Sequence, residues 1–432
     1  MSHGQGGGGP DARHAAPSAR RPPRRRWPWV LGLVVVVIVG WTAWLAIDAV
    51  RARAELASAS SLVGVLQEAV LAGDRDEATA TLQELQLHAE QARDATRGVH
   101  WTAAAALPWV GPNVSAVQVV ADVVDDLATA ALPALMEATQ IVDPATMAPV
   151  DGRVDIGALE LAAPAVVAAD AVVADALARL DGIDAAQLWS PVAGPLGQVR
   201  EKVAGVAATT ETASRAVQLL PAMLGADGPR DYLLLVQNNA ELRATGGIPG
   251  SVSLLRAEDG AVTIVETRSG GSLGDLPAPV VPMTDAELAL FGEDLAADMR
   301  DVTFTPDFPR GAAIAREIWA QQVGGEVDGV VSVDPGALAL LLDDTGPVPL
   351  PAGPVAAAVG GQLTSENAVQ VLLNTVYLAE PDPAAQDAFF AQTATATLGA
   401  LMSGQGEPAA ALEALAEAAR QGRLLLQALA EG

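Results

Sequence analysis

The stretch Asp231–Ser251, DYLLLVQNNAELRATGGIPGS, decides how the second half of this chain folds. The apolar run Tyr232–Val236 is typical of a buried strand. It ends in a polar tip, residues 237–245, which is followed by the pair Gly246-Gly247 and then by a second apolar run. The sequence therefore predicts two strands that meet at a polar edge of a sheet.

Two interpretations of the polar tip are open. Hydrogen-bonding side chains crowded at the end of a strand suit the mouth of a sheet, where ligands usually bind. Alternatively, the asparagines make Asx-turns and the glycines only supply positive φ angles. On the first interpretation the candidate ligand-binding residues of the tip are Asn238, Asn239, Glu241, Arg243, Thr245, Gly246 and Gly247.

Two further segments contain candidate binding residues. Arg268 ends the next predicted strand, and the loop Ser269–Ser272 that follows it consists of glycine and serine. An arginine beside such a loop is a reasonable cradle for a phosphate group, although a solvated strand end is the simpler alternative. The loop at residues 301–310 holds the candidate Asp307 between two phenylalanines, which either wall a pocket or fill the core.

The N-terminus predicts a membrane anchor. Residues 27–47 contain no charged side chain, and 21 residues are enough for a helix that spans a bilayer. Residues 1–26 contain six arginines and one acidic residue, and are expected to form a disordered cytoplasmic tail. A cleaved signal peptide fits less well, because the apolar run is too long and no small-x-small cleavage site follows. We therefore expect a single-pass protein of the cell membrane, with its N-terminus cytoplasmic and its body extracytoplasmic.

The charge of the chain and its cysteine and histidine content exclude several kinds of partner and site. Outside the tail there are 19 basic and 51 acidic residues, a net charge of about −32, so we expect no nucleic-acid partner. The absence of cysteine excludes disulfides and thiolate metal sites. The four histidines all precede residue 101, so the later α/β part has no histidine for a catalytic triad or a zinc site.

Composition divides the chain after the anchor into three parts. Residues 48–225 are predicted to form a helical stalk, residues 226–403 an α/β domain, and residues 404–432 a C-terminal helix. In the stalk, an apolar seam in alternating steps of four and three residues predicts a helical hairpin: Ala78, Leu82, Leu85, Ala89 and Ala92. Later stalk helices are expected at 114–140, 157–181 and 196–223, with breaks at 101–113 and at Asp143-Pro144.

In the α/β domain, strand and helix signals alternate. Strands are predicted at 232–236, 252–257, 262–267 and 330–333, and helices at 309–323, from Pro335, and at 367–378, 383–401 and 408–429. The predicted fold class is α/β, with an N-terminal transmembrane helix, a helical stalk and a mixed-sheet α/β/α domain.

Several motifs resemble those of a family of membrane-anchored actinobacterial proteins that is classed as a domain of unknown function. The polar tip carries QNNAELR-x-TGG at residues 237–247. Further motifs follow in the family's order, over about residues 228–402: Asp301–Pro309 (DVTFTPDFP), Val327–Pro335 (VDGVVSVDP), Thr345–Val348 (TGPV), Thr364–Tyr377 and Asp387–Phe390 (DAFF). This resemblance implies a lineage and supplies no reaction.

The order of elements is also distantly similar to that of the LytR-CpsA-Psr phosphotransferases, which are single-pass proteins with an external α/β domain. That resemblance, carried by the passage Gly329–Val348, implies magnesium-dependent transfer of a glycopolymer from a polyprenyl pyrophosphate, with Arg243 and Arg268 as pocket arginines. The chain departs from the pattern at Ser269, where the family has aspartate, and at Asn238 or Asn239, where it has a metal-binding aspartate.

These observations lead to two expectations from different classes. The first is an envelope protein that binds or transfers a polyprenyl-linked or phosphorylated glycan, with magnesium as the cofactor of a transfer. The second is a non-enzymatic scaffold whose helices bind a partner protein. The sequence does not decide whether the protein is an enzyme.

Overall fold

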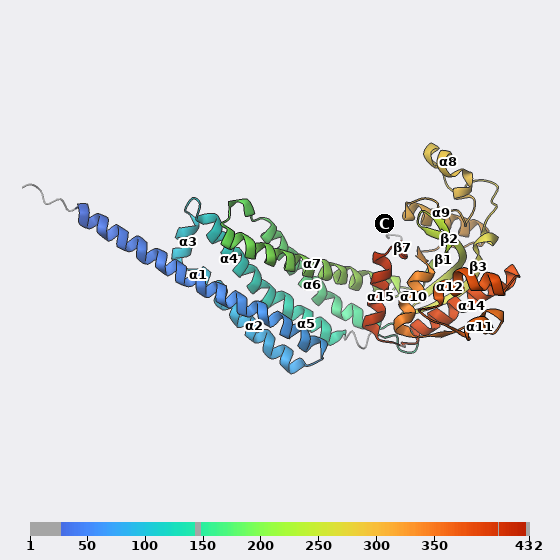
Figure 1. Ribbon diagram of the computed structural model, residues 1–432, viewed down its shortest axis with the longest axis horizontal. Coiled ribbons are helices and arrows are strands. Elements are labelled where there is room, and N and C mark those ends of the chain that lie inside the picture. Colours follow the sequence, from blue (N-terminus) through green and yellow to red (C-terminus); the bar gives the residue numbers. More distant parts are fainter. Residues whose placement is uncertain (1–26, 143–147, 405, 429–432) are drawn as a thin grey trace, which may run out of the picture. The chain divides into compact units, whose positions relative to one another are not determined.

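The structure, a computed structural model, describes residues 27–142, 148–404 and 406–428 (Figure 1). It confirms the predicted class, because a helical N-terminal region with an apolar helix is followed by a domain with a mixed sheet. The chain divides into two compact units, residues 1–121 and 122–432. The predicted tail at residues 1–26 and the break at Asp143-Pro144 lie outside the described residues, and the predicted domain boundaries stay predictions.

The first unit is organised along one helix. Helix α1 runs without interruption over Trp27–Leu71, so the predicted membrane segment and the first stalk helix are continuous. Its N-terminal part is apolar on every side, and residues such as Trp29 and Val36 are well exposed. A helix that is apolar all round and unpacked is typical of a membrane span, and α1 is long enough to be one.

Helix α2, Arg75–Thr96, returns along α1 and forms the predicted hairpin. Gly73 ends α1 with a φ of +70°, and the carboxylate of Asp74 accepts a hydrogen bond of 3.0 Å from the Glu77 amide to begin α2. All five residues of the predicted seam are buried, which confirms the seam. His88 of α2 also lies 2.6 Å from the carboxylate of Glu55 on α1.

Helices α3, Val99–Ala105, and α4, Gly111–Asp126, follow. Residues 101–113 were expected to be a broken connector, and this expectation is wrong for most of the segment. Proline is tolerated in the first turn of a helix, where its missing N–H has no partner to lose, so Pro112 helps to begin α4.

The second unit begins inside α4, at Asp122, and continues through further helices. These are the π-helical turn η1, Leu127–Ala131, then α5, Leu132–Ile141, α6, Ile156–Asp181, the short 3-10 turn η3, Ala185–Gln187, and α7, Ser190–Met223. They confirm the three later stalk helices, although α7 starts six residues early and contains Pro195. Helix α6 is also long and apolar enough to cross a membrane. However, its heptad seam from Leu159 to Leu180 is buried, as expected for a packed core helix.

The main sheet has five strands in the order β3-β2-β1-β4-β7. Strands β1 and β4 are parallel, and the other neighbours are antiparallel. The strands are β1 Arg230–Arg243, β2 Gly246–Glu258, β3 Ala261–Ser269, β4 Gly329–Val333 and β7 Leu424–Ala428.

Helices cover both faces of the sheet, which explains the continuous apolar run in β1. Leu233 and Leu235 pack with α9, Phe308–Gln322, including its buried Trp319. Tyr232 and Leu234 point to the other face, where they cluster with Leu398 of α14, Pro383–Met402. Side chains alternate along a strand, so a strand buried on both sides is apolar at every position.

The remaining elements surround this sheet. Between β3 and α9 lie η4 Gly270–Leu273, α8 Asp285–Phe291 and η5 Glu293–Ala296. After β4 come α10 Pro335–Thr345, β5 Val348–Pro349, α11 Pro354–Val359, β6 Gln362–Leu363, α12 Ala368–Gln370, η6 Val371–Thr375, α13 Val376–Ala379 and α15 Pro408–Arg420.

Two predicted boundaries in the α/β domain are wrong. The polar tip is not a loop between strands, since β1 continues through it to Arg243. The last helix was expected over residues 408–429, but α15 ends at Arg420, and the chain turns at Gly422 with a φ of +68°. Residues 424–428 then pair with β4, because hydrogen bonding to an open sheet edge outweighs their local helical preference.

The α1–α2 hairpin gives a first testable prediction. Leu85 is 3% exposed on the seam, whereas Leu87 of the same helix is 51% exposed. Leu85→Asp places an unpaired charge in an apolar contact and should destabilise the hairpin by several kcal/mol. Leu87→Asp should change the melting temperature of the detergent-solubilised protein little. Equal effects of the two substitutions on circular dichroism melts would show that the seam does not hold the hairpin together.

Candidate functional site

Strands β1 and β2 form a long hairpin whose tip carries most of the predicted site residues. Arg243 pairs with Gly246 across a turn at residues 244 and 245, and a bulge leaves residues 239–241 without a partner on β2. Val236 pairs with Val333, the last residue of the parallel neighbour β4, so the bulge of β1 lies just beyond the carboxyl end of β4. Ligands of α/β proteins commonly bind at this edge.

Gln237 holds the two sides of the hairpin together from inside. Its amide nitrogen donates to the Thr245 carbonyl at 3.0 Å and to Ser332 Oγ at 2.7 Å, and its amide oxygen accepts from the Gly247 N–H at 2.9 Å. A Cβ on Gly246 would come within 1.9 Å of the Gln237 amide oxygen. A Cβ on Gly247 would come within 2.3 Å of the Asn238 carbonyl oxygen. The two glycines therefore allow close approach inside the hairpin.

The two asparagines have different surroundings. The side-chain oxygen of Asn238 accepts from the Ala240 N–H at 2.9 Å, which is an Asx-turn, and its amide donates to the Tyr377 hydroxyl. The amide of Asn239 donates to the buried carboxylate of Asp334 at 3.0 Å. The side-chain oxygen of Asn239 is buried and has no hydrogen-bond partner among the described residues.

Thr245 connects the tip to the loop before α9. Both its amide and its hydroxyl donate to the carbonyl of Thr303, at 3.3 and 3.2 Å, and Thr303 Oγ1 donates to the Gly247 carbonyl at 3.0 Å. Glu241 is exposed on the bulge. Asp307 is exposed at the start of α9, where its side chain makes no capping hydrogen bond.

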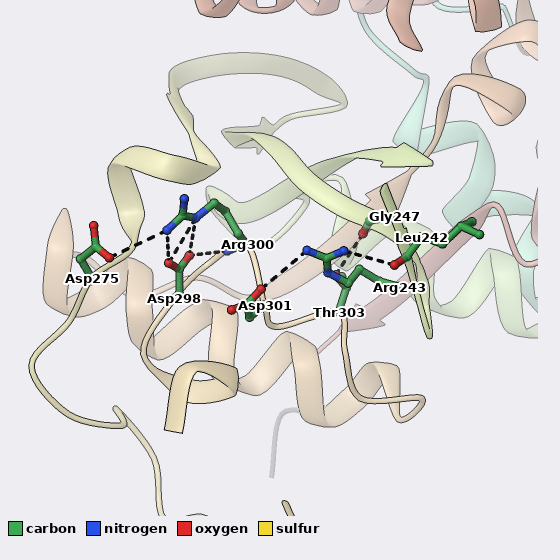
Figure 2. A network of polar contacts seen from close by, with 8 residues as sticks. All are labelled: Leu242, Arg243, Gly247, Asp275, Asp298, Arg300, Asp301 and Thr303. Atoms are coloured by element: carbon green, nitrogen blue, oxygen red, sulfur yellow. Dashed lines mark hydrogen bonds and ion pairs between the residues drawn. The ribbon is translucent and has the colours of Figure 1, made fainter. Parts of the chain in front are cut away.

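Arg243 lies in this contact region and is mostly buried, with 16% of its side chain exposed. Its guanidinium stacks over the ring of Phe304, 4.3 Å from the ring centre. Figure 2 shows it directed toward Asp301, at a distance of 3.8 Å that is too long for a hydrogen bond. One η nitrogen donates to the Leu242 carbonyl, while the buried Nε has no hydrogen-bond partner in the described chain. The guanidinium therefore has unused donors.

The pKa values of two neighbouring carboxyl groups in the same loop, those of Asp298 and Asp301, are shifted in opposite directions. Burial opposes ionisation of Asp298, but hydrogen bonds from the guanidinium and the amide of Arg300 outweigh it and lower the pKa of Asp298 (Figure 2). Burial and the negative charge of Asp298 raise the pKa of Asp301, and Arg243 offsets only part of this effect. Perturbed carboxyl groups beside an incompletely bonded arginine are typical of functional sites, although structural ion pairs produce the same effect.

A small cavity lies elsewhere, between the β2–β3 pair and α14. Its volume is about 180 Å³, and its lining consists of Ser251, Thr267, Arg268, Ser269, Asp387, Ala388 and Ala391. Ser251 is 6% exposed, and its hydroxyl has no hydrogen-bond partner among the described residues. Thr267 Oγ1 and Ser253 Oγ share a hydrogen bond of 2.9 Å. Arg268 forms an ion pair with Glu266 on the same strand.

The structure gives Arg243 and Arg268 different surroundings. Arg243 is opposite Gly246 on β2 and Arg268 is opposite Val252, so the two positions are about 20 Å apart along the strand. Their ion-pair partners, Asp301 and Glu266, also differ. Within residues 27–142, 148–404 and 406–428, no group of three or more His, Asp or Glu side chains could hold a metal ion.

Ser251, Thr267 and Asp387 were not among the predicted site residues. One signal in the sequence was Ser253 inside the predicted strand 252–257, with Ser251 two residues earlier, because both lie in β2. Two hydroxyls on one face of a buried strand indicate a polar spot inside the domain. Asp387 comes from a helix 118 residues after Ser269 in the chain, and no local pattern connects them.

The raised pKa of Asp301 predicts a pH-dependent effect on stability. A carboxyl group with a higher pKa in the folded state contributes stability below its unfolded pKa of about 3.9, and loses it as the pH rises through the folded value. Asp301→Asn imitates the protonated form and should raise the melting temperature at pH 7. The gain should disappear near pH 3.

Asp275→Asn is the matched control. Asp275, like Asp301, is an aspartate that interacts with the Arg300 guanidinium, but its side chain is 92% exposed. It should leave the melting temperature almost unchanged at both pH values. A lower melting temperature for Asp301→Asn at pH 7 would mean that the attraction between Asp301 and Arg243 outweighs the burial of the carboxylate.

Comparison with known proteins adds a family relationship for this part of the chain. No curated protein matches it. Residues 227–377 match the model of a family described as "Protein of unknown function (DUF4012)". The matched range begins before β1, ends in α13 and contains the hairpin tip, the loop around Asp301 and β4. The predicted resemblance to a family of unknown function is thereby confirmed in its general form: residues 227–377 are similar to DUF4012.

Proposed function

We propose that the protein is anchored in the cell membrane by α1, and that its α/β domain binds a sugar unit of a phosphorylated or polyprenyl-linked glycan outside the cytoplasm. The exposed apolar surface of α1 supports the anchor. The arginines at 24–26 support a cytoplasmic N-terminus by the positive-inside rule. A domain of unknown function behind such a helix is compatible with an envelope protein.

This proposal rests on Ser251, a residue in the wall of the cavity whose hydroxyl has no hydrogen-bond partner among the described residues. A buried hydroxyl without a partner is uncommon, because it has lost its hydrogen bonds to water. A ligand hydroxyl would satisfy it after rotation of the Ser251 side chain, because the hydroxyl oxygen itself is not exposed to the cavity. The lining supplies the acceptor of Asp387 and serine and threonine hydroxyls that both donate and accept, while two alanines give an apolar wall. This mixture suits a sugar ring, which has polar edges and an apolar face.

The volume of the cavity and the arginine beside it further restrict which class of ligand can bind. A volume of about 180 Å³ is below the range of about 300–1,000 Å³ of pockets for drug-sized ligands, so it suits one ring. Arg268 lies beside the cavity, and its pairing with Val252 directs its half-exposed side chain to the other face of the sheet, so its guanidinium would contact a phosphate outside the cavity. Since the body carries a large negative charge, an anionic ligand depends on such local arginines.

We propose binding in preference to magnesium-dependent transfer. The expected metal-binding aspartate is replaced by Asn238 or Asn239, which bond to Tyr377 and Asp334. The described residues offer no cluster of acidic side chains for a metal ion near either arginine. A non-enzymatic scaffold remains the alternative outcome of the experiment below.

Binding can be tested on the full-length protein in nanodiscs. The probes are a short-chain prenyl phosphate linked to a hexose, the same prenyl phosphate without sugar, and free hexose, each titrated calorimetrically with and without magnesium. Ser251→Ala and Arg268→Gln should each weaken binding of the sugar-linked probe by about tenfold or more, as expected for hydrogen bonds worth about 1.5–3 kcal/mol. Ser251→Ala removes an unsatisfied group, so folding stability should not fall.

Arg256→Gln is the matched control for the arginine. Arg256 lies on the neighbouring strand β2, pairs with Asp231, and is 43% exposed compared with 50% for Arg268. It should bind the probe like wild type. If wild type binds none of the probes at millimolar concentration, the proposed glycan binding is wrong, and a non-enzymatic scaffold becomes the proposed function. If both cavity variants bind like wild type, the ligand site lies elsewhere.

A further inference from the structure

We infer that residues 99–110 form a second membrane contact, in which Trp109 and its apolar neighbours lie in the outer membrane–water interface beside α1. We call residues 99–110 the interfacial segment. The inference rests on the proposed anchoring by α1 and extends it, because residues 101–113 were expected only to connect helices.

The composition of the segment is the first observation. Residues 98–121 contain no Asp, Glu, Lys or Arg, in a chain of which 18% is charged. The interfacial segment itself has one titratable side chain, His100, which is buried and bonded to Asp48. A charge-free surface can enter the headgroup region without desolvating a charged group.

The second observation is the position of the segment along α1, which lies in the same compact unit. Trp101 is buried in a cluster to which Trp41, Leu45 and Ala49 of α1 contribute. The ring of His100 stacks on Trp44 at 4.2 Å, and its Nε2 lies 2.9 Å from the Asp48 carboxylate. Helix α3 is therefore fixed beside residues 41–49 of α1 (Figure 1).

The length of the span places this contact at the outer interface. Residues 27–47 rise about 30 Å as a helix, which equals the thickness of the hydrocarbon core. With Trp27 at the inner boundary, the outer boundary falls near Ile47, and Asp48 is the first charged residue beyond it. The elements that pack on residues 41–49 are consequently level with the headgroups and the upper acyl chains.

The third observation is what the segment exposes there. Val99 is 81% exposed, Trp109 is 83% exposed and Leu107 is 41% exposed. Trp109 also has a φ of +66°, a conformation that is rare for a bulky residue. A strained tryptophan that presents nearly its whole side chain to the surroundings indicates a contact absent from the isolated chain.

Lipid fits this contact, because the exposed surface continues into the span. Trp44 and Ile47 of α1 are each 53% exposed and belong to the same apolar region. Tryptophan prefers the membrane interface, where its ring meets acyl chains and its N–H meets water. The segment would thus hold the first unit against the bilayer at a second point and limit its rotation about α1.

Single-cysteine labelling tests the inference directly, because the natural chain contains no cysteine. Trp109→Cys, Val99→Cys, Val36→Cys and Val63→Cys are labelled separately with an environment-sensitive nitrobenzoxadiazole fluorophore and reconstituted in phosphatidylcholine–phosphatidylglycerol vesicles. Val63, 50% exposed, lies on α1 about 24 Å beyond Ile47 and is the aqueous control. Quenching is measured with lipids that carry a doxyl group at the shallow position 5 or the deep position 12.

We expect the Trp109 and Val99 labels to emit to the blue of the Val63 label and to be quenched severalfold more by the shallow quencher. The deep quencher should act most strongly on the Val36 label. Water-like emission without quenching at 109 and 99, together with quenching at 36, overturns the inference and leaves the anchor intact. Absence of quenching at all four positions overturns the anchor itself, and the inference with it.

Discussion

The buried carboxylate of Asp334 holds the α/β domain together at the edge of its sheet. One oxygen caps α10 by accepting from the Ala337 N–H at 2.8 Å, and the other accepts from Asn239 and from Arg423. These partners come from the first turn of α10, the bulge of β1 and the residue before β7. A buried charge with three hydrogen bonds is tolerated, whereas loss of any partner leaves it incompletely satisfied. The position of the hairpin bulge, and so of the tip, depends on this carboxylate.

The elements that local chemistry specifies could be predicted from the sequence. The caps at Asp74 and Asp334, the stop at Gly346 and the turn at Asp259-Gly260 are each local combinations of side chain and backbone, and the structure has them all. The last strand could not be predicted in this way. Residues 424–428 form β7 only because β4 offers an open edge, and that edge is formed about 90 residues earlier in the chain.

The residues of the candidate site also form two groups, those that the local sequence predicts and those that only the fold brings together. The tip residues were predicted as a group because they are consecutive, and the structure gives Gln237, Thr245 and both glycines roles inside the hairpin. The alternative interpretation as an Asx-turn describes Asn238, whereas Asn239 and Arg243 keep buried polar atoms without partners. The cavity near Arg268 needs Ser251 from one strand and Asp387 from a distant helix. Proximity of that kind is a property of the assembled sheet, and no spacing in the sequence encodes it.

The late position of β7 has a consequence for biosynthesis. The inner strands are complete once residue 333 has been made, but the outer edge of β4 is covered only by residues 424–428. At about 5–20 residues per second, translation of the intervening segment takes roughly 5–20 s. During that time the nascent chain carries an uncovered strand edge, which is a template for pairing with another chain. The nascent domain is therefore vulnerable to misassembly at this edge until residues 424–428 have been made and cover β4.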